Sequence, residues 1–222
     1  MLQNKTLQFL KDLKKNNNRE WFAEHKDNYE NAKADFELLI EHLISSLSKV
    51  DKRLESNTPK DCIFRIYRDV RFSKNKEPYK ANFGASIKPG GKKSVACGFY
   101  LHIEPEGGWG SFVGGGYYMP EAALLRKIRQ EIEYNHEEFI KLLKDKNFKK
   151  HFGTLEQEHT LTRVPKGFDP EHPAAEFLKY TSFIASEPLT AAQLKSKDFI
   201  KTCTASYKAM LPFLDFLNRV ND

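Results

Sequence analysis

Residues 64–80 are the most unusual stretch of the chain, because they are basic and aromatic at once. Guanidinium groups grip phosphate and carboxylate groups through paired N–H donors. If residues 61–72 form a strand, Arg65 and Arg71 share one face and lie about 13 Å apart. Tyr67 and Asp69 fall between them on that face. This spacing predicts a site for an extended anion.

The candidate ligand-binding residues supply charge or an aromatic ring that can stack on a ligand or bond its oxygen. They are Arg65, Tyr67, Arg68, Arg71, Lys76, Tyr79, Lys80, Tyr100 and Lys166. A structural interpretation is equally open. In it, Asp69 pairs with an arginine on its own face, Arg68 meets a carboxylate from a helix, and the lysines after Phe72 form an ordinary solvated loop.

A second group lies in residues 95–104, where Tyr100, His102 and Glu104 share the face opposite an apolar one. A histidine next but one to a carboxylate can act as a general base with an orienting partner. The candidate catalytic residues are therefore His102, Asp69 and Glu104. A solvated histidine on an exposed sheet face is the simpler interpretation. His102 and Glu104 supply two ligands where catalytic zinc takes three, so we expect no metal and no cofactor.

The glycine run Gly114-Gly115-Gly116 precedes a predicted helix, as phosphate-cradling loops do. The Lys-Ser/Thr pair of a P-loop does not follow it, and the GxGxxG pattern is missing. A flexible turn from strand to helix is therefore favoured over a nucleotide site.

Composition narrows the class of protein. The 222 residues carry a formal net charge of +6, which favours anionic partners without naming one. Three widely separated cysteines, Cys62, Cys97 and Cys203, are typical of buried thiols in a reducing compartment. No signal peptide or membrane-length apolar run is evident, so we expect a cytoplasmic protein without membrane contact.

The elements that position these residues follow from hydrophobic periodicity. Helical spacing covers the first fifty residues, with a break at 16–18 where Asn18 caps a helix beginning at Arg19. Helices are also predicted from Pro120 to about Phe152 and over 199–219. Trp21, Phe22 and Tyr29 are interpreted as core packing.

Alternation with a period of two predicts strands over 61–72, 83–87, 95–104 and 109–113, with a further one at 180–186. Short turns between them, one at residues 105–108, require antiparallel pairing. The expected fold is therefore α+β, with an antiparallel sheet of about four to five strands in the middle of the chain. N-terminal and C-terminal helices pack on this sheet. No linker or repeat interrupts the pattern, which predicts a single domain over 1–222.

Several of these motifs together resemble a known family. They are Asn17 to Phe22, Phe64 to Phe72, Lys76 to Lys80, Gly115-Gly116 before Met119-Pro120, Pro165 to Phe168, and Leu211 to Leu214. Their order resembles domain of unknown function 2461, a family of uncharacterised bacterial and fungal proteins, over nearly the whole chain. The resemblance implies no activity, cofactor or catalytic residue.

The leading functional prediction is binding or processing of a phosphate-bearing or other anionic small molecule on a basic, aromatic sheet face. One alternative is a hydrolase-type enzyme that uses His102, so the sequence leaves catalysis open. Nucleic-acid binding, a less favoured partner class, and an interaction scaffold are the others. The sequence does not give the oligomeric state.

Overall fold

The computed structural model describes residues 1–105, 108–158 and 160–221. The chain divides into two compact units. Unit 1 comprises Met1–Ser94, Tyr100–Val113 and Pro188–Thr204, and unit 2 comprises Val95–Phe99, Gly114–Glu187 and Ala205–Asp222. The single-domain organisation stays a prediction.

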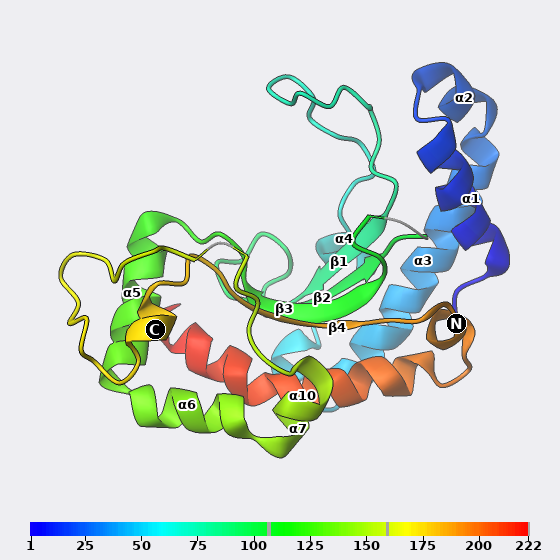
Figure 1. Ribbon diagram of the computed structural model, residues 1–222. Coiled ribbons are helices and arrows are strands. Elements are labelled where there is room, and N and C mark those ends of the chain that lie inside the picture. Colours follow the sequence, from blue (N-terminus) through cyan, green and yellow to red (C-terminus); the bar gives the residue numbers. More distant parts are fainter. Residues whose placement is uncertain (106–107, 159, 222) are drawn as a thin grey trace. The chain divides into compact units, whose positions relative to one another are not determined.

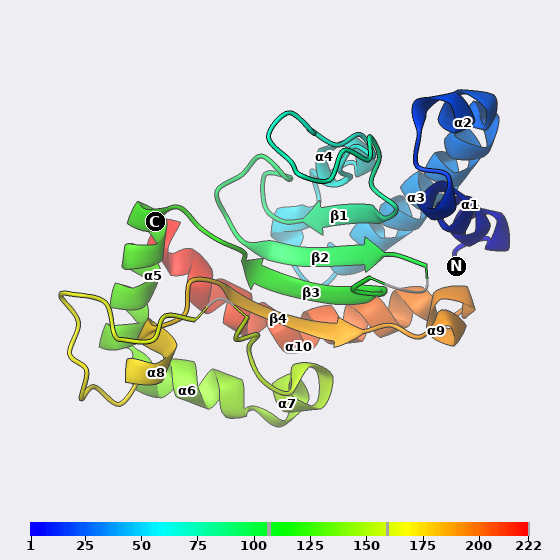
Figure 2. The same ribbon diagram turned by 45° about the horizontal axis from the view of Figure 1, so that its top comes forward.

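The four strands of the described residues form one antiparallel sheet in the order β1-β2-β3-β4 (Figure 2). Their bounds are Phe83–Ile87, Gly98–Ile103, Phe112–Tyr117 and Phe183–Pro188. The α+β fold with a mid-chain sheet is thereby confirmed, with four strands. Phe99, Leu101 and Ile103 of β2 are fully buried, and the residues between them are partly exposed. The period-two pattern therefore located both faces of this strand.

Helices precede the sheet in unit 1 (Figure 1). They are α1 (Asn4–Lys15), α2 (Arg19–Glu24), α3 (Lys26–Leu47), the short turn η1 (Lys52–Leu54) and α4 (Pro59–Cys62). Asn18 caps α2 as predicted, because its Oδ1 accepts a hydrogen bond from the Trp21 amide at 2.8 Å. The apolar stripe of α3 is buried, and its Phe36 stacks on Phe83 of β1 with ring centroids 5.1 Å apart.

The helices of unit 2 begin with α5 (Ala122–Tyr134), α6 (His136–Lys144), α7 (Lys146–Phe152) and α8 (Ala175–Leu178). Unit 1 also contains α9 (Ala191–Lys195), and α10 (Phe199–Asn218) contributes residues to both units before η2 (Arg219–Asn221). In unit 2, Tyr207 of α10 packs edge-on against Phe99 at 5.4 Å between ring centroids. No helix among the described residues is long and apolar enough to span a membrane.

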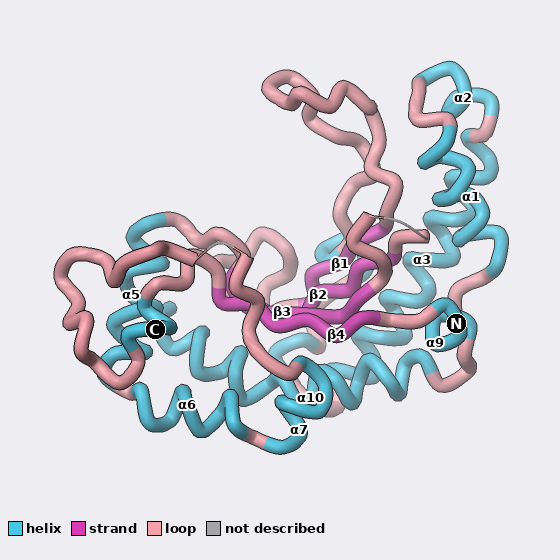
Figure 3. Tube along the Cα trace, in the orientation of Figure 1, coloured by secondary structure: helices cyan, strands magenta, loops and turns pink. Residues whose placement is uncertain are grey.

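The predicted strand over 61–72 is wrong. Cys62 ends the short helix α4, and the following residues form an irregular excursion that is loop along its length (Figure 3). Isolated bridges link Ile63 with Ala85 and Tyr67 with Tyr79. Phe72, which lies on the apolar face of that predicted strand, is 96% exposed. Alternation alone does not make a strand, because a regular neighbour must pair with it and a core must cover its apolar face.

The interpretation of the glycine run as a strand-to-helix turn is also wrong, because Gly114 to Gly116 lie inside β3. A side chain at Gly114 would approach the carbonyl oxygen of Ala185 to 2.8 Å. One at Gly116 would collide with the carbonyl oxygen of Phe183. The glycines therefore allow close approach within unit 2 and form no phosphate loop.

The remaining expectations differ in smaller ways. The strand expected over 109–113 begins at Phe112, and the one expected over 180–186 begins at Phe183. Two residues of the predicted turn at 105–108, Glu106 and Gly107, lie outside the described residues. All three cysteines are buried and form no disulfide. Burial raises the pKa of the Cys62 thiol to about 11.

Candidate functional site

A chain of hydrogen bonds runs along the polar face of β2 in unit 1. The Tyr100 hydroxyl lies 3.2 Å from Nδ1 of His102, and Nε2 of His102 lies 3.4 Å from Oε2 of Glu104. An ionised carboxylate can only accept a hydrogen bond. We therefore assign the ring proton to Nε2, which donates a hydrogen bond to Glu104. Nδ1 then accepts from the Tyr100 hydroxyl. We call this arrangement the Tyr100–His102–Glu104 chain.

The histidine of this chain is not solvated, which corrects the simpler sequence interpretation. Its side chain is 12% exposed and stacks on Phe112 of β3 with ring centroids 4.8 Å apart. Burial lowers the pKa of His102, the hydrogen bond and charge of Glu104 oppose that change, and the charge of Lys80 lowers it further. A neutral imidazole is therefore the favoured form near neutral pH.

The tyrosine lies at the open end of the chain. Burial raises the pKa of Tyr100 to about 12, so its phenol stays protonated and can donate. The phenol passes close over β1, where Gly84 leaves space for it: a Cβ at Gly84 would lie 2.5 Å from the Tyr100 hydroxyl oxygen. The side-chain amide of Asn82 is 3.4 Å from Nδ1 of His102.

The glutamate is held from three sides. Lys14 of α1 places Nζ 3.1 Å from Oε1, and the Trp109 amide donates to Oε2 at 3.2 Å. The Glu104 backbone amide donates to Ser111 Oγ at 3.0 Å. Glu104 is therefore held in place and fixes the orientation of the His102 ring, as an orienting carboxylate does for a catalytic histidine.

Lys80 connects this chain to the excursion, which we call the basic arm, residues 64–80. Its backbone amide donates to the Ile66 carbonyl at 2.8 Å, and its Nζ lies 5.6 Å from the centre of the Phe64 ring. Burial lowers the pKa of Lys80, and the charges of Arg65 and Arg68 lower it further. Lys80 has no ion pair within the part of the chain that the structure describes.

The other arginines and lysines of the basic arm have protein partners or lie in solvent. Arg68 is half-buried, with Nη1 3.6 Å from Glu77 Oε2, a carboxylate of the arm itself and not of a helix. At the tip, Arg71 forms a bidentate pair with Asp69 at 2.9 and 2.6 Å. Lys76 donates to the Val70 carbonyl at 3.0 Å. Both Asp69 and Arg71 are exposed, so this pair contributes little stability.

The two tyrosines of the arm pack against α2. Tyr79 is buried and stacks on Phe22 with ring centroids 4.0 Å apart, and its backbone exchanges hydrogen bonds with the Asn17 side chain at 3.0 and 3.1 Å. Tyr67 is half-exposed and lies 6.0 Å from Phe22 between ring centroids. These contacts anchor the base of the arm to the aromatic cluster predicted around Phe22 and Tyr29.

The structure therefore brings together Lys80, Tyr100, His102 and Glu104, with the charges of Arg65 and Arg68 acting on Lys80. Asp69, Arg71 and Lys76 lie at the arm tip. Lys166 is exposed in a loop of unit 2. Sequence reasoning missed Lys14, Asn82 and Phe112, which come from three different segments and carry no local signal. Gly84 was detectable only as a glycine inside a predicted strand.

Comparison with known proteins gives the family and nothing about activity. No curated protein and no solved structure matches the chain. Residues 5–216, almost the whole chain, match the family described as conserved hypothetical protein (DUF2461). The chain therefore belongs to domain of unknown function 2461, as its motifs predicted.

Proposed function

We propose that the chain binds a phosphate-bearing or other anionic small molecule at the base of the basic arm, between Lys80 and the Tyr100–His102–Glu104 chain. The observation that carries the proposal is the state of Lys80. It is partly desolvated, repelled by Arg65 and Arg68, and without an acidic partner among the described residues. Such an arrangement costs free energy that a bound anion offsets.

The charge of the arm supports an anionic ligand. Residues 64–80 hold six lysines and arginines against two acidic residues, so they carry +4 of the chain's formal +6. Arg65 and Arg68 offer fork-shaped donors to such a ligand. Lys76, Arg71 and Lys166 are peripheral in this proposal, and Tyr67 and Tyr79 support the arm by packing.

The test is a titration with inorganic phosphate and pyrophosphate at constant ionic strength, followed by calorimetry and thermal denaturation. At about a hundred times the dissociation constant, the ligand stabilises the native state by about 2.7 kcal/mol. We expect Lys80→Met to abolish this shift without unfolding the protein. Lys74→Met, which removes a charge from the arm tip, is the matched control. A shift that persists in Lys80→Met refutes the proposed site.

A second candidate function is acid–base catalysis, favoured by the Tyr100–His102–Glu104 chain. Both nitrogens of His102 are occupied, so the group that would meet a substrate is the Tyr100 phenol, with His102 accepting its proton and Glu104 stabilising the resulting imidazolium. The assay is hydrolysis of a panel of p-nitrophenyl esters and phosphoesters. We expect any turnover to be lost in both Tyr100→Phe and His102→Asn; full turnover in His102→Asn excludes this role.

The two remaining interpretations are outcomes of the same titrations. Binding of a short oligonucleotide that weakens steeply with salt would favour a nucleic-acid partner. No binding of any anion would favour a scaffold, with the arginines as part of the architecture. The three buried thiols fit a reducing compartment, and we propose the cytoplasm on that ground.

A further inference from the structure

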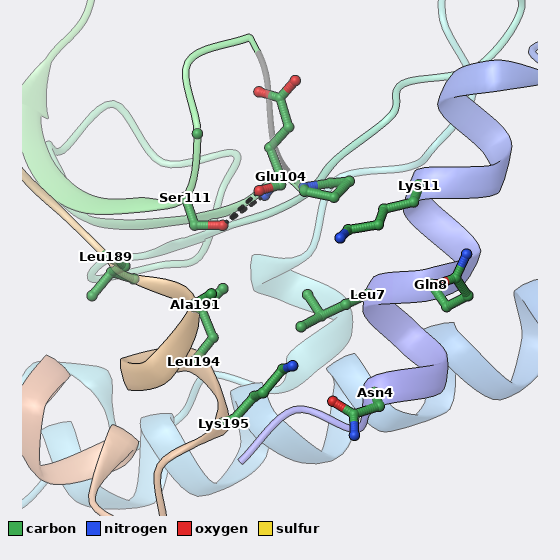
Figure 4. Close-up of a pocket in the computed structure, with 12 residues that line it drawn as sticks. Asn4, Leu7, Gln8, Lys11, Glu104, Ser111, Leu189, Ala191, Leu194 and Lys195 are labelled. Atoms are coloured by element: carbon green, nitrogen blue, oxygen red, sulfur yellow. Dashed lines mark hydrogen bonds between the residues drawn. The ribbon is translucent and has the colours of Figure 1, made fainter.

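A cavity of about 650 Å³ lies in unit 1 between α1 and α3, and α2 with the residue that follows it contributes to its wall. The volume falls in the range of small-molecule sites, roughly 300–1,000 Å³. Figure 4 shows a different face of α1, from which Leu7 and Lys11 point toward α9. The described residues that line the cavity between α1 and α3 include none that build the Lys80 site or the Tyr100–His102–Glu104 chain.

The long walls of the cavity are polar faces of two helices. Asn28, Asn31 and Asp35 line it from α3 at spacings of three and four residues, which place them on one face of that helix. Gln8 and Asp12 line it from α1 at a spacing of four. The side chains of Asn28 and Asn31 form no hydrogen bond with the part of the chain that the structure describes. Both amides are therefore available to a ligand.

Part of the lining is apolar and aromatic. Phe9 and Ala32 line the cavity, and each is more than nine-tenths buried. The Trp21 ring lies 6.2 Å from the Phe9 ring and stacks on His25 at 4.1 Å between ring centroids. Leu38 also lines the cavity and is 49% exposed. This surface suits a hydrocarbon chain or a ring of a ligand.

Asp35 is the buried charged group of this cavity. The residue is 9% exposed, and its Oδ2 accepts hydrogen bonds from the Thr6 hydroxyl at 2.5 Å and the Gln3 amide at 2.9 Å. Its Oδ1 accepts none from the described residues, and no lysine, arginine or histidine among them forms an ion pair with Asp35. A buried carboxylate without a cation costs free energy, which a cationic ligand offsets.

Two further acceptors line the same cavity. Asp12 Oδ1 accepts from the Gln8 side-chain amide at 2.8 Å, and Asp12 forms no ion pair within the described ranges. Nδ1 of His25 lies 2.8 Å from the Trp21 carbonyl oxygen, which only accepts, so we assign the ring proton to Nδ1. In the neutral ring, Nε2 is then an acceptor. Against these groups stands the exposed Lys5, the one lysine or arginine among the described lining residues.

From this combination we infer a second ligand site, which takes a primary amine with a small apolar body. An ammonium group carries one positive charge and three N–H donors and has no acceptor, so it complements Asp35, Asp12 and Nε2 of His25. The apolar body lies against Phe9 and Trp21. The proposed anion site depends on Lys80, so the two inferences stand or fall independently.

The experiment is a titration of the ¹⁵N-labelled protein with phenethylamine, phenethyl alcohol and phenylpropionate near neutral pH and at constant ionic strength, with amide chemical shifts as the readout. We expect phenethylamine to shift the signals of α1 and α3 and to saturate. Phenethyl alcohol should bind about tenfold more weakly, because it lacks the charge-assisted hydrogen bonds, and phenylpropionate should not bind. Equal affinity for the amine and the alcohol, or no saturation by the amine, overturns the inference.

Variants locate the ammonium group. Asp35→Asn removes the charge while its amide oxygen can still accept from Thr6 and Gln3, and it should weaken phenethylamine binding about tenfold. Glu41→Gln removes a charge from α3 outside the cavity and is the matched control, which should change nothing. Lys5→Met removes the opposing cation and should strengthen binding. Weaker binding by Lys5→Met, or undiminished binding by Asp35→Asn, overturns the inference.

Two more variants separate this site from the rest of the molecule. Asn31→Trp, which places an indole in the cavity, should abolish phenethylamine binding. Lys80→Met should leave phenethylamine binding intact while removing phosphate binding. Undiminished phenethylamine binding by Asn31→Trp places the amine elsewhere and overturns the inference. The ligand series on the unmodified chain decides the matter if a variant does not fold.

Discussion

Substitution of Gly84 by alanine tests whether the Tyr100–His102–Glu104 chain depends on the glycine beneath it. The new Cβ would lie 2.5 Å from the Tyr100 hydroxyl oxygen and 3.2 Å from Cζ. Real Cβ atoms essentially never approach a heavy atom closer than 3.0 Å, so the hydroxyl must move by about 0.5 Å or more. Its bond to His102 Nδ1 is 3.2 Å long and has little room to stretch before it is lost.

The energetic cost of this change is small in total. A lost hydrogen bond costs about 0.5–1.5 kcal/mol. Replacement of glycine by alanine returns about 0.4–1 kcal/mol, because the unfolded chain loses conformational freedom and β1 requires no positive φ here. We therefore expect Gly84→Ala to lower the free energy of unfolding by about 1 kcal/mol at most, while the ring environment of His102 changes clearly.

The assay combines urea denaturation with ¹⁵N spectra of the histidine ring nitrogens. The Nδ1 signal of His102 should move in Gly84→Ala and move the same way in Tyr100→Phe, because both remove one donor. Ser86→Ala, two positions along the same strand, is the matched control and should leave that signal in place. An unchanged Nδ1 signal in Gly84→Ala, with normal folding, would refute the close approach of Gly84 to Tyr100.

Three further predictions concern stability. Arg129 of α5 is 8% exposed, its Nε has no partner among the described residues, and its Nη2 donates to the Tyr180 carbonyl at 2.9 Å. Because burial alone lowers the pKa of Arg129, Arg129→Met should change the unfolding free energy in urea by less than about 1 kcal/mol; a loss of about 3–5 kcal/mol would indicate a carboxylate partner. Gly116→Ala combines a φ of +116° with collision against the Phe183 carbonyl, so we expect it to destabilise by more than about 2 kcal/mol, and a neutral effect would contradict the packing of β3. The lowered pKa of His102 means that the unfolded state binds more protons below about pH 6.5, so stability should fall as pH falls from there toward the folded-state pKa. In urea titrations at several pH values, the free energy of unfolding of His102→Gln should depend less steeply on pH than that of the unmodified chain. An identical dependence on pH would assign the effect to another group.

Local signals determined much of the fold. The apolar stripe of α3, the cap at Asn18 and the alternation of β2 each depend on residues close in sequence, and each was confirmed. The same alternation is enough to group Tyr100, His102 and Glu104 on one face. Such patterns predict helices and strands well because the spacing of apolar residues along the sequence reflects which face of the element is buried.

Tertiary structure alone decided how the candidate site is assembled. Residues 61–72 have the alternation of a strand, yet among the described residues no regular strand pairs with them, and their bridges are isolated. Lys14 reaches Glu104 from α1 across ninety positions of sequence. Lys14 contacts a carboxylate, whereas Lys80 has no carboxylate partner among the described residues. This difference depends on packing between distant segments. Sequence therefore determined which residues share a local face, and the long-range packing of unit 1 decided which of them meet.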